Sequence, residues 1–344
     1  AYINDNVAFT GNFRFDQAIG SSSGTTNGFN WTIAPKDSSG SRGFASWNDQ
    51  TATITLSLPA GYSSFKLGFG SDLNSDANDE SYGIDNLSII PSNISSADTL
   101  TLNASTITGN VTTGSGADAV SVLTGSKITG SLNLGSNTDT KDSGDTLTVT
   151  GVPSGTKSEI TGSITTGGGA DTLTLTDATI GGAGQTISLG SDNNSNDGND
   201  ALNASGTAIT AAITTGSGSD SVSLSVASSV AGNVTLGSDG DTTNGNTDNL
   251  SLNASTITGN VVTGSGADGV SVLNTSTITG NVTLGSNSDS ADSGDTLTVT
   301  GASSSSKSVV TGSIATGAGA DILTLTNATI GSAGQTISLG TDSN

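Results

Sequence analysis

Ten aspartates recur along most of the chain, and each of them opens a short run in which apolar and polar residues alternate. They are separated by 20 to 29 residues and are Asp98, Asp118, Asp145, Asp171, Asp200, Asp220, Asp248, Asp268, Asp295 and Asp321. A carboxylate in such a position can exchange a proton in catalysis, ligate a hard cation, or accept a hydrogen bond from its own turn. The residues around each aspartate decide among these roles.

Two kinds of glycine-containing turn precede these aspartates, and they mostly alternate along the chain. The short turn reads G-x-G-x-D and occurs five times, for example at residues 114–118 and 264–268. The long turn begins L-G-S or L-G-T, passes through a cluster of Asp and Asn residues, and ends at the next recurring aspartate, as at residues 135–145. Its last copy stops at Asn344. Carboxylate and carbonyl oxygens at this density are the ligands that calcium prefers.

If successive segments of the chain stack, we expect the recurring aspartates to line one edge of the stack and to repel one another. Two like charges about one strand spacing apart repel by about 1 kcal/mol even in water. No Lys or Arg stands between Lys157 and Lys307 to compensate. Bound calcium would remove the repulsion, but an aspartate could also cap its own turn while salt screens its charge. The sequence leaves both explanations open.

We take the aspartates of both turn types as candidate calcium ligands, with the better candidates in the long turns. They are Asp118, Asp139, Asp142, Asp145, Asp171, Asp192, Asp197, Asp200, Asp220, Asp239, Asp241, Asp248, Asp268, Asp289, Asp292, Asp295 and Asp321. A separate candidate site lies in "SDLNSDANDES", where oxygens stand at alternate positions as in a D-x-N-x-D calcium loop. Its ligands would be Asp72, Asn74, Asp76, Asn78, Asp79 and Glu80.

The segment "GGGADTLTL" at residues 167–175 resembles the calcium-binding nonapeptide repeat G-G-x-G-x-D-x-U-x of RTX (repeats-in-toxin) proteins. "GAGADILTL" and "GSGADAVSV" are similar, and the strands between the turns also resemble the β-helices of bacterial surface proteins. The resemblance covers the repeat region and implies an extracellular, calcium-binding β-solenoid. In that family the motif is carried on consecutive nonapeptides, whereas here it returns only with every second aspartate.

The chain is strongly repetitive after residue 97. Residues 98–194 align without a gap with residues 248–344, at a constant offset of 150. Within this unit each aspartate is followed by residues that alternate with period two, which is typical of a strand with one buried face. A pair of strands that recurs every 20 to 29 residues buries its apolar face only by stacking on its copies. We therefore predict a parallel β-solenoid of about ten coils over residues 97–344.

Glycines fall inside the alternating pattern at Gly109, Gly162 and Gly280. A glycine weakens a strand unless the chain bends there or another backbone segment approaches closely. We expect one of these two reasons to apply.

The first 92 residues form a separate region that holds all the aromatic side chains of the chain. Short β-like runs alternate with turns rich in Gly, Ser, Asn and Asp, which favours a β-sandwich. The ending "DESYGIDNLSI" resembles the last strand of jelly-roll domains in bacterial extracellular and carbohydrate-binding proteins. The fold class is therefore all-β, with a jelly-roll-like β-sandwich at residues 1–92 and the solenoid after it.

Composition narrows the function classes. The chain of 344 residues carries a formal net charge of −22 and has no Cys, Met or His. Such acidity excludes nucleic acid as a partner, since phosphate contacts need Lys and Arg. No apolar run approaches the length that spans a bilayer, and "AYINDNVAFT" does not read as a signal peptide. With no His, and no Arg or Tyr in the repeat region, we expect no catalytic site and no enzyme.

These observations favour an extracellular structural repeat protein that binds calcium and assembles with its own copies into a surface layer or a filament. A cell-surface adhesin, or a carbohydrate-binding module on a solenoid stalk, is the alternative, with cell-surface polysaccharide as partner. Two further functions, ice binding and polysaccharide cleavage, are less favoured by the sequence. An ice-binding face would need an uninterrupted Thr-x-Thr ladder, and a polysaccharide-acting enzyme would need basic residues beside its carboxylates.

Overall fold

The computed structural model describes residues 2–3, 6–7, 22–27, 29–37, 51–57, 67–68, 97–136, 142–191, 197–237, 246–285 and 292–340. All regular elements in these ranges are β-strands. Consequently the described part contains no helix that could cross a membrane. The chain divides into two compact units, and each of them is described by itself below.

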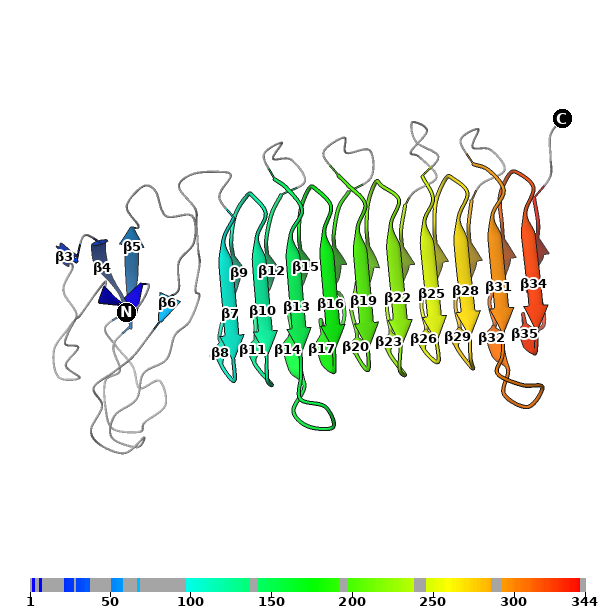
Figure 1. The fold of residues 1–344 in the computed structure, drawn as a ribbon, viewed down its shortest axis with the longest axis horizontal. Helices are drawn as coiled ribbons and strands as arrows, with labels where there is room; N and C mark the ends of the chain where they lie inside the picture. Colours follow the sequence, from blue (N-terminus) through cyan, green and yellow to red (C-terminus); the bar gives the residue numbers. More distant parts are fainter. Residues whose placement is uncertain are drawn as a thin grey trace. The chain divides into compact units, whose positions relative to one another are not determined.

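The larger unit is a parallel β-solenoid of ten coils, as the repeats predict (Figure 1). Each coil starts at one of the ten recurring aspartates and contributes one strand to each of three ten-stranded parallel sheets. The first sheet contains β7 (Thr99–Asn103), β10 (Ala119–Leu123), β13 (Thr146–Thr150), β16 (Thr172–Thr176), β19 (Ala201–Ser205), β22 (Ser221–Ser225), β25 (Asn249–Asn253), β28 (Gly269–Leu273), β31 (Thr296–Thr300) and β34 (Ile322–Thr326).

The other two sheets are built from shorter strands. The second sheet contains β8 (Thr106–Ile107), β11 (Lys127–Ile128), β14 (Ser158–Ile160), β17 (Ala178–Ile180), β20 (Ala208–Ile209), β23 (Ser229–Val230), β26 (Thr256–Ile257), β29 (Thr277–Ile278), β32 (Ser308–Val310) and β35 (Ala328–Ile330). The third sheet contains β9 (Val111–Thr112), β12 (Leu132–Asn133), β15 (Ile164–Thr165), β18 (Thr186–Ser188), β21 (Ala212–Thr214), β24 (Val234–Thr235), β27 (Val261–Val262), β30 (Val282–Thr283), β33 (Ile314–Ala315) and β36 (Ile337–Ser338).

Three strands per coil replace the pair that the sequence pattern predicts. The glycine inside the pattern marks the corner between the second and third strands. Gly109 has a φ of 118°, which favours glycine, and it bends the chain between β8 and β9. A Cβ at Gly162 would overlap the backbone of Gly130 in the coil before it, so the coils approach closely at this corner. Both reasons expected for these glycines therefore occur.

An aliphatic core runs through the solenoid, because the inward positions of successive strands are in register. Leu147 of β13 pairs with Leu173 of β16, and both side chains are fully buried. The second and third sheets add Ile160 and Ile164 to the same layer of the core, again fully buried. In coil ten the equivalent apolar residues are more open, and Leu325 is 46% exposed.

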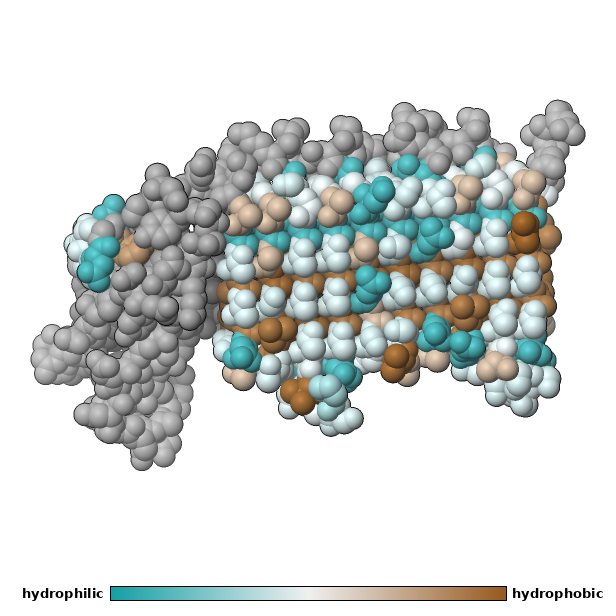
Figure 2. Space-filling model, viewed as in Figure 1, coloured by the Kyte–Doolittle hydropathy of each residue, from teal (hydrophilic) through white to brown (hydrophobic). Residues whose placement is uncertain are grey.

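The outward positions of the first sheet carry mostly small polar side chains. Figure 2 shows them as pale rows that run across the strands, alternating with brown apolar rows. One such row contains Thr148 and Thr174 but continues with Asn203 and Ser223. The threonine ladder that an ice-binding face would need is thus interrupted in the first sheet.

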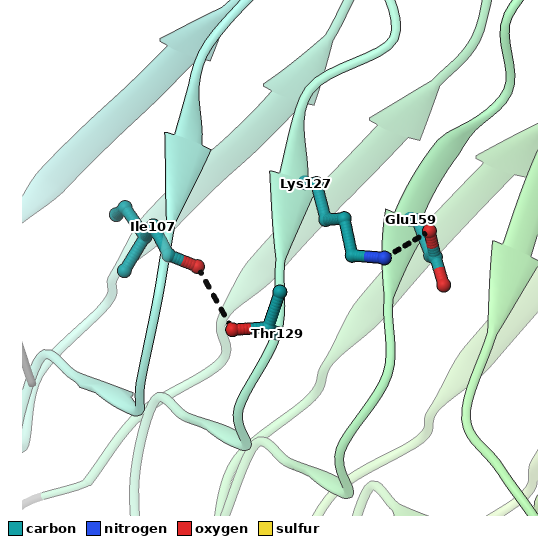
Figure 3. A network of polar contacts seen from close by, with 4 residues as sticks. All are labelled: Ile107, Lys127, Thr129 and Glu159. Carbon is teal, nitrogen blue, oxygen red and sulfur yellow. Dashed lines mark hydrogen bonds and ion pairs between the residues drawn. The ribbon is translucent and has the colours of Figure 1, made fainter. Parts of the chain in front are cut away.

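One surface ion pair in the first half of the 150-residue duplication has no counterpart in the second half. Lys127 of β11 and Glu159 of β14 form an ion pair at 2.8 Å (Figure 3). Close to it, the Thr129 hydroxyl donates to the Ile107 carbonyl at 3.5 Å. At the same two paired positions of the second half stand Thr277 and Val309. The pairing of the strands is kept without the charges, so it does not depend on them.

The described residues of the smaller unit form two antiparallel three-stranded sheets. One has the order β2-β1-β6, and the other has the order β3-β4-β5. Their strands are β1 (Tyr2–Ile3), β2 (Asn6–Val7), β3 (Ser22–Thr26), β4 (Phe29–Asp37), β5 (Thr51–Ser57) and β6 (Leu67–Gly68). Phe29 and Ile33 are buried. These sheets agree with an all-β unit, while the jelly-roll-like last strand lies outside the described residues.

Candidate functional site

The ten recurring aspartates form one continuous row inside the solenoid, which we call the aspartate ladder. Each ladder residue directly precedes a strand of the first sheet, at the corner where the third strand of one coil leads into the next coil. Asp98 to Asp295 are all buried, with exposed fractions of at most 8%. The sequence had placed these carboxylates along an edge of the coils, whereas the structure turns them into the interior.

Eight of the ladder carboxylates, from Asp145 to Asp321, accept a hydrogen bond from the backbone of the coil before them. The N–H of Asp118 donates to Oδ1 of Asp145, and the N–H of Asp145 donates to Oδ1 of Asp171, both at 2.7 Å. The same bond, at 2.7 to 3.0 Å, then links Asp171 to Asp200, Asp200 to Asp220, Asp220 to Asp248, Asp248 to Asp268, Asp268 to Asp295, and Asp295 to Asp321. The ladder bonds therefore join neighbouring coils, whereas a capping aspartate would bond within its own turn.

The second carboxylate oxygen has a different environment in the two turn types. In the short turns a buried threonine stands five residues before the aspartate, and its hydroxyl donates to the carboxylate in the pairs Thr166–Asp171 and Thr316–Asp321. In the long-turn coils a leucine occupies the position equivalent to this threonine. Leu189, for example, stacks on Thr166, whose Oγ1 also donates to the Leu189 carbonyl at 3.0 Å. A leucine side chain offers no donor to the ladder.

Oδ2 of Asp145, Asp200 and Asp295, the ladder residues of three long turns, is buried without a hydrogen-bond partner among the described residues. The same holds for Oδ2 of Asp268 in a short turn. Leaving a charged oxygen buried and unpaired costs free energy unless a proton or a cation joins it.

The pKa values of the ladder follow this alternation. Burial raises the pKa of Asp145 to about 9, of Asp200 to about 10 and of Asp295 to about 8, although the N–H of the preceding coil lowers each of them. Burial also raises the pKa of Asp171 to about 7 and of Asp268 to about 6. In these short turns the shift is smaller because Thr166 and Thr263 lower the pKa of their aspartates. Thr263 does so although its own hydrogen bond goes to the Leu284 carbonyl.

A second aspartate stands three residues before the ladder residue in three of the long turns. We call Asp142, Asp197 and Asp292 the corner aspartates. Asp142 accepts hydrogen bonds from the N–H groups of Ser136 at 2.6 Å and Gly168 at 3.1 Å, and more weakly from Gly116 at 3.4 Å. These donors belong to three successive coils, so the carboxylate cross-links them.

The other two corner aspartates have similar backbone donors. Asp197 accepts from Ser191 at 3.0 Å and Ser217 at 2.9 Å, and Asp292 accepts from Ala318 at 2.7 Å. Burial nevertheless raises the pKa of Asp197 to about 7, with the charge of Asp220 contributing. Its Oδ1 is buried and has no hydrogen-bond partner within the described ranges.

Glycines make room for each corner aspartate. A Cβ at Gly135, or at Gly167 in the next coil, would overlap the carboxylate of Asp142. Gly190 and Gly216 enclose Asp197 in the same way, and Gly285 and Gly317 enclose Asp292. The glycines of both turn types are thus required by the carboxylate between them as well as by the positive φ of the short turns.

The fourth long turn lacks the corner aspartate. Gly245 stands three residues before Asp248, and the segment from Gly237 to Asp248 is one residue longer than its counterparts. At this corner the carboxylate close to the glycine belongs to the ladder residue. Oδ2 of Asp248 would lie 3.2 Å from a Cβ at Gly237. Three long turns therefore have an aspartate three residues before the ladder residue, and the fourth has a glycine there.

The described structure brings together many, but not all, of the candidate ligands. The ladder residues and the corner aspartates share one corner of the solenoid. The remaining candidates, Asp72, Asn74, Asp76, Asn78, Asp79, Glu80, Asp139, Asp192, Asp239, Asp241 and Asp289, lie outside the described residues. Within the described ranges no three acidic side chains are grouped so as to hold a metal ion. Any cation at a corner would need further oxygens from backbone, water or the rest of the long turn.

The sequence reasoning missed the buried threonines. Thr113, Thr166, Thr215, Thr263 and Thr316 are fully buried, and each stands directly before the G-x-G-x-D motif. The recurrence of T-G-x-G-x-D, against L-G-S or L-G-T in the long turns, was a readable signal for them.

Comparisons with known proteins give no relative for this chain. No protein-family model matches it, no curated protein matches it, and no solved structure matches it.

Proposed function

We propose that this chain is an extracellular structural repeat protein whose solenoid is a stiff spacer stabilised by calcium. The observation that carries the proposal is the aspartate ladder, because its hydrogen bonds couple the stacking of nine coils, the second to the tenth, to the state of a row of carboxylates. Aliphatic side chains fill the interior around the ladder. We therefore assign the solenoid a mechanical role as a rigid spacer and no role in enclosing a ligand.

Calcium is the cation that suits this corner. It takes 6–8 oxygen ligands in flexible geometry and accepts carboxylates together with carbonyls and water. The long turns carry the acidic residues, and three of the ladder carboxylates there have a buried oxygen without a partner in the described part. No Lys or Arg between Lys157 and Lys307 competes for these carboxylates.

The same chemistry supports an extracellular location. Sites with few protein carboxylates bind calcium with dissociation constants of roughly 10⁻⁴–10⁻³ M, which suits extracellular modules. The resemblance of the short turns to RTX repeats supports this location and a role of the surface-layer, filament or adhesin kind.

We further propose that copies of the chain assemble, head to tail or laterally, into a lattice or a filament. Repeat arrays of this kind extend by adding like surfaces, and open heterologous contacts generate filaments. The unit at residues 1–92 would then be the contact or attachment module, with cell-surface polysaccharide as its alternative partner. No step of this proposal uses a catalytic residue, a nucleic acid or insertion into a membrane.

Electron microscopy of the full chain with calcium and with a chelator tests the proposal. We expect ordered filaments or sheets with calcium, and dispersed particles or loss of order with chelator. Circular dichroism recorded on the same samples separates assembly from folding. Assemblies and thermal stability that are the same in chelator would contradict the roles given to calcium, and a monodisperse monomer in calcium would contradict self-assembly.

A further inference from the structure

Three of the four long turns differ from every other corner in a way that points to a ligand. They hold a corner aspartate and a ladder aspartate three residues apart, in the pairs Asp142–Asp145, Asp197–Asp200 and Asp292–Asp295. The ladder member of each pair is at most 2% exposed, and its Oδ2 has no hydrogen-bond partner among the described residues. None of these pairs belongs to a G-x-G-x-D motif.

We propose that each of these three pairs holds one divalent cation, calcium being the best fit, and that the short turns hold none. This inference rests on the proposed role of calcium and specifies where the ions bind. The pair Asp197–Asp200 carries the argument furthest, because Asp197 Oδ1 and Asp200 Oδ2 are both buried and both lack a partner in the described part.

The remaining oxygens of this pair already have fixed donors, which leave the unpartnered oxygens for the ion. Asp197 Oδ2 accepts from the N–H groups of Ser191 and Ser217, and Asp200 Oδ1 accepts from the N–H of Asp171 at 2.7 Å. Each carboxylate is thereby oriented with one oxygen toward the backbone. A cation that bridges the other two oxygens would also neutralise two charges that repel each other.

The short turns do not provide the same pair of unpartnered carboxylate oxygens. In the turn that ends at Asp171, the hydroxyl of Thr166 donates to the carboxylate. Oδ2 of Asp268 has no hydrogen-bond partner in the described part, but it stands alone, since no short turn has a second aspartate three residues earlier. A short turn therefore supplies a single carboxylate of its own, whereas each pair supplies two from one turn.

The two carboxylates do not complete a calcium shell. Calcium takes 6–8 oxygens, and backbone carbonyls and water can supply the others.

Counting bound calcium in the full chain by equilibrium dialysis at millimolar calcium tests the assignment. Asp200→Asn keeps Oδ1 as an acceptor for the N–H of Asp171 and removes the charge, so this variant should bind one calcium fewer than the wild-type chain. The triple variant D145N/D200N/D295N should bind three fewer. The matched control is Asp248→Asn, a ladder residue of a long turn without a corner aspartate, which should bind as much calcium as the wild type.

Folding of each variant is checked by circular dichroism. If Asp200→Asn does not fold, Asp197→Asn replaces it, because it removes the other carboxylate of the same pair and should also lose one calcium. Wild-type calcium content in D145N/D200N/D295N, or the same loss in Asp248→Asn as in Asp200→Asn, would overturn the inference while leaving calcium stabilisation intact. A wild-type chain that binds no calcium would overturn both, and it would leave the structural role of the solenoid to stand on assembly alone.

Discussion

The backbone N–H of Asp171 donates to Oδ1 of Asp200 at 2.7 Å, although 29 residues separate the two in the chain. Because this bond is repeated from coil to coil, each ladder carboxylate is an acceptor for the coil before it. Hydrogen bonds to an ionised acceptor are stronger than those to a neutral carbonyl. The charge on the ladder therefore has two opposing effects on the stability of the fold. It strengthens these hydrogen bonds, but burying it costs free energy.

The buried threonines should stabilise the short turns. Thr166→Val removes the donor to the Asp171 carboxylate and to the Leu189 carbonyl. We expect the free energy of unfolding to fall by about 1–3 kcal/mol, the usual effect of leaving a buried acceptor unsatisfied. Urea unfolding measures this change. The control Thr174→Val, at an outward position of β16, should change it by less than about 0.5 kcal/mol. Equal effects of the two variants would contradict the role of the buried hydroxyl.

Core packing should depend on the coil in which a leucine stands. Leu175 is fully buried, whereas Leu325, its counterpart 150 residues later, is 46% exposed. Leu175→Ala should lower the free energy of unfolding by about 2–5 kcal/mol because it leaves a cavity. Leu325→Ala should cost less than half as much, since less apolar surface is lost from burial. Denaturant unfolding of the two variants, side by side, checks the order.

The glycine next to a corner aspartate should be less replaceable than other glycines with positive φ. A Cβ at Gly184, where φ is 79°, would meet no atom within 4 Å, so Gly184→Ala tests backbone strain alone, about 1–2 kcal/mol. Gly167, with a φ of 113°, would in addition bring its Cβ onto the Asp142 carboxylate and onto the backbone of Gly135 and Ser136. We expect Gly167→Ala to lower the melting temperature clearly more than Gly184→Ala. A smaller effect at Gly167 would mean that the carboxylate moves aside at little cost.

Most of the solenoid could be predicted because its signals are local. The alternation after each aspartate and the glycine turns are sufficient for ten parallel coils. The third strand was missed because β8 and β9 are two residues long each, which is too short for a period-two pattern to separate them. The sequence pattern from Ile107 to Val111 therefore predicted one strand with a glycine inside it, where the structure has two strands.

The aspartate ladder could be located but not understood from the sequence. Charged side chains are rarely buried, so the ten aspartates were expected at an edge of the coils. What makes their burial possible is a donor 20 to 29 residues earlier, which no local pattern reveals. Asp142 illustrates the same limit, since it was a candidate ligand by its turn, while its backbone donors come from three coils.

The ion pair between Lys127 and Glu159 should contribute little to stability. Both side chains are about one-third exposed, at 38% and 33%, and exposed pairs are typically worth between about 0 and 1 kcal/mol. The double variant K127T/E159V introduces the residues that stand at the equivalent positions, Thr277 and Val309. We expect its free energy of unfolding to stay within about 0.5 kcal/mol of the wild type in urea. A loss above about 1 kcal/mol would show that the pair organises the second sheet after all.

Stability of the calcium-free protein should fall as the pH rises from about 4 to about 10. Burial raises the pKa of Asp145, Asp200 and Asp295 to about 9, 10 and 8, from an ordinary value of 3.8. A raised pKa means that the folded state binds these protons more tightly than the unfolded state does. Their contribution is therefore complete below the ordinary pKa and is lost progressively as the pH approaches the folded-state values. Urea unfolding in calcium-free buffer at pH 5, 7 and 9 should give steadily decreasing free energies of unfolding. Asp200→Asn cannot ionise, so its decrease should be shallower, whereas a stability that rises between pH 5 and 9 would contradict the burial of the charged ladder.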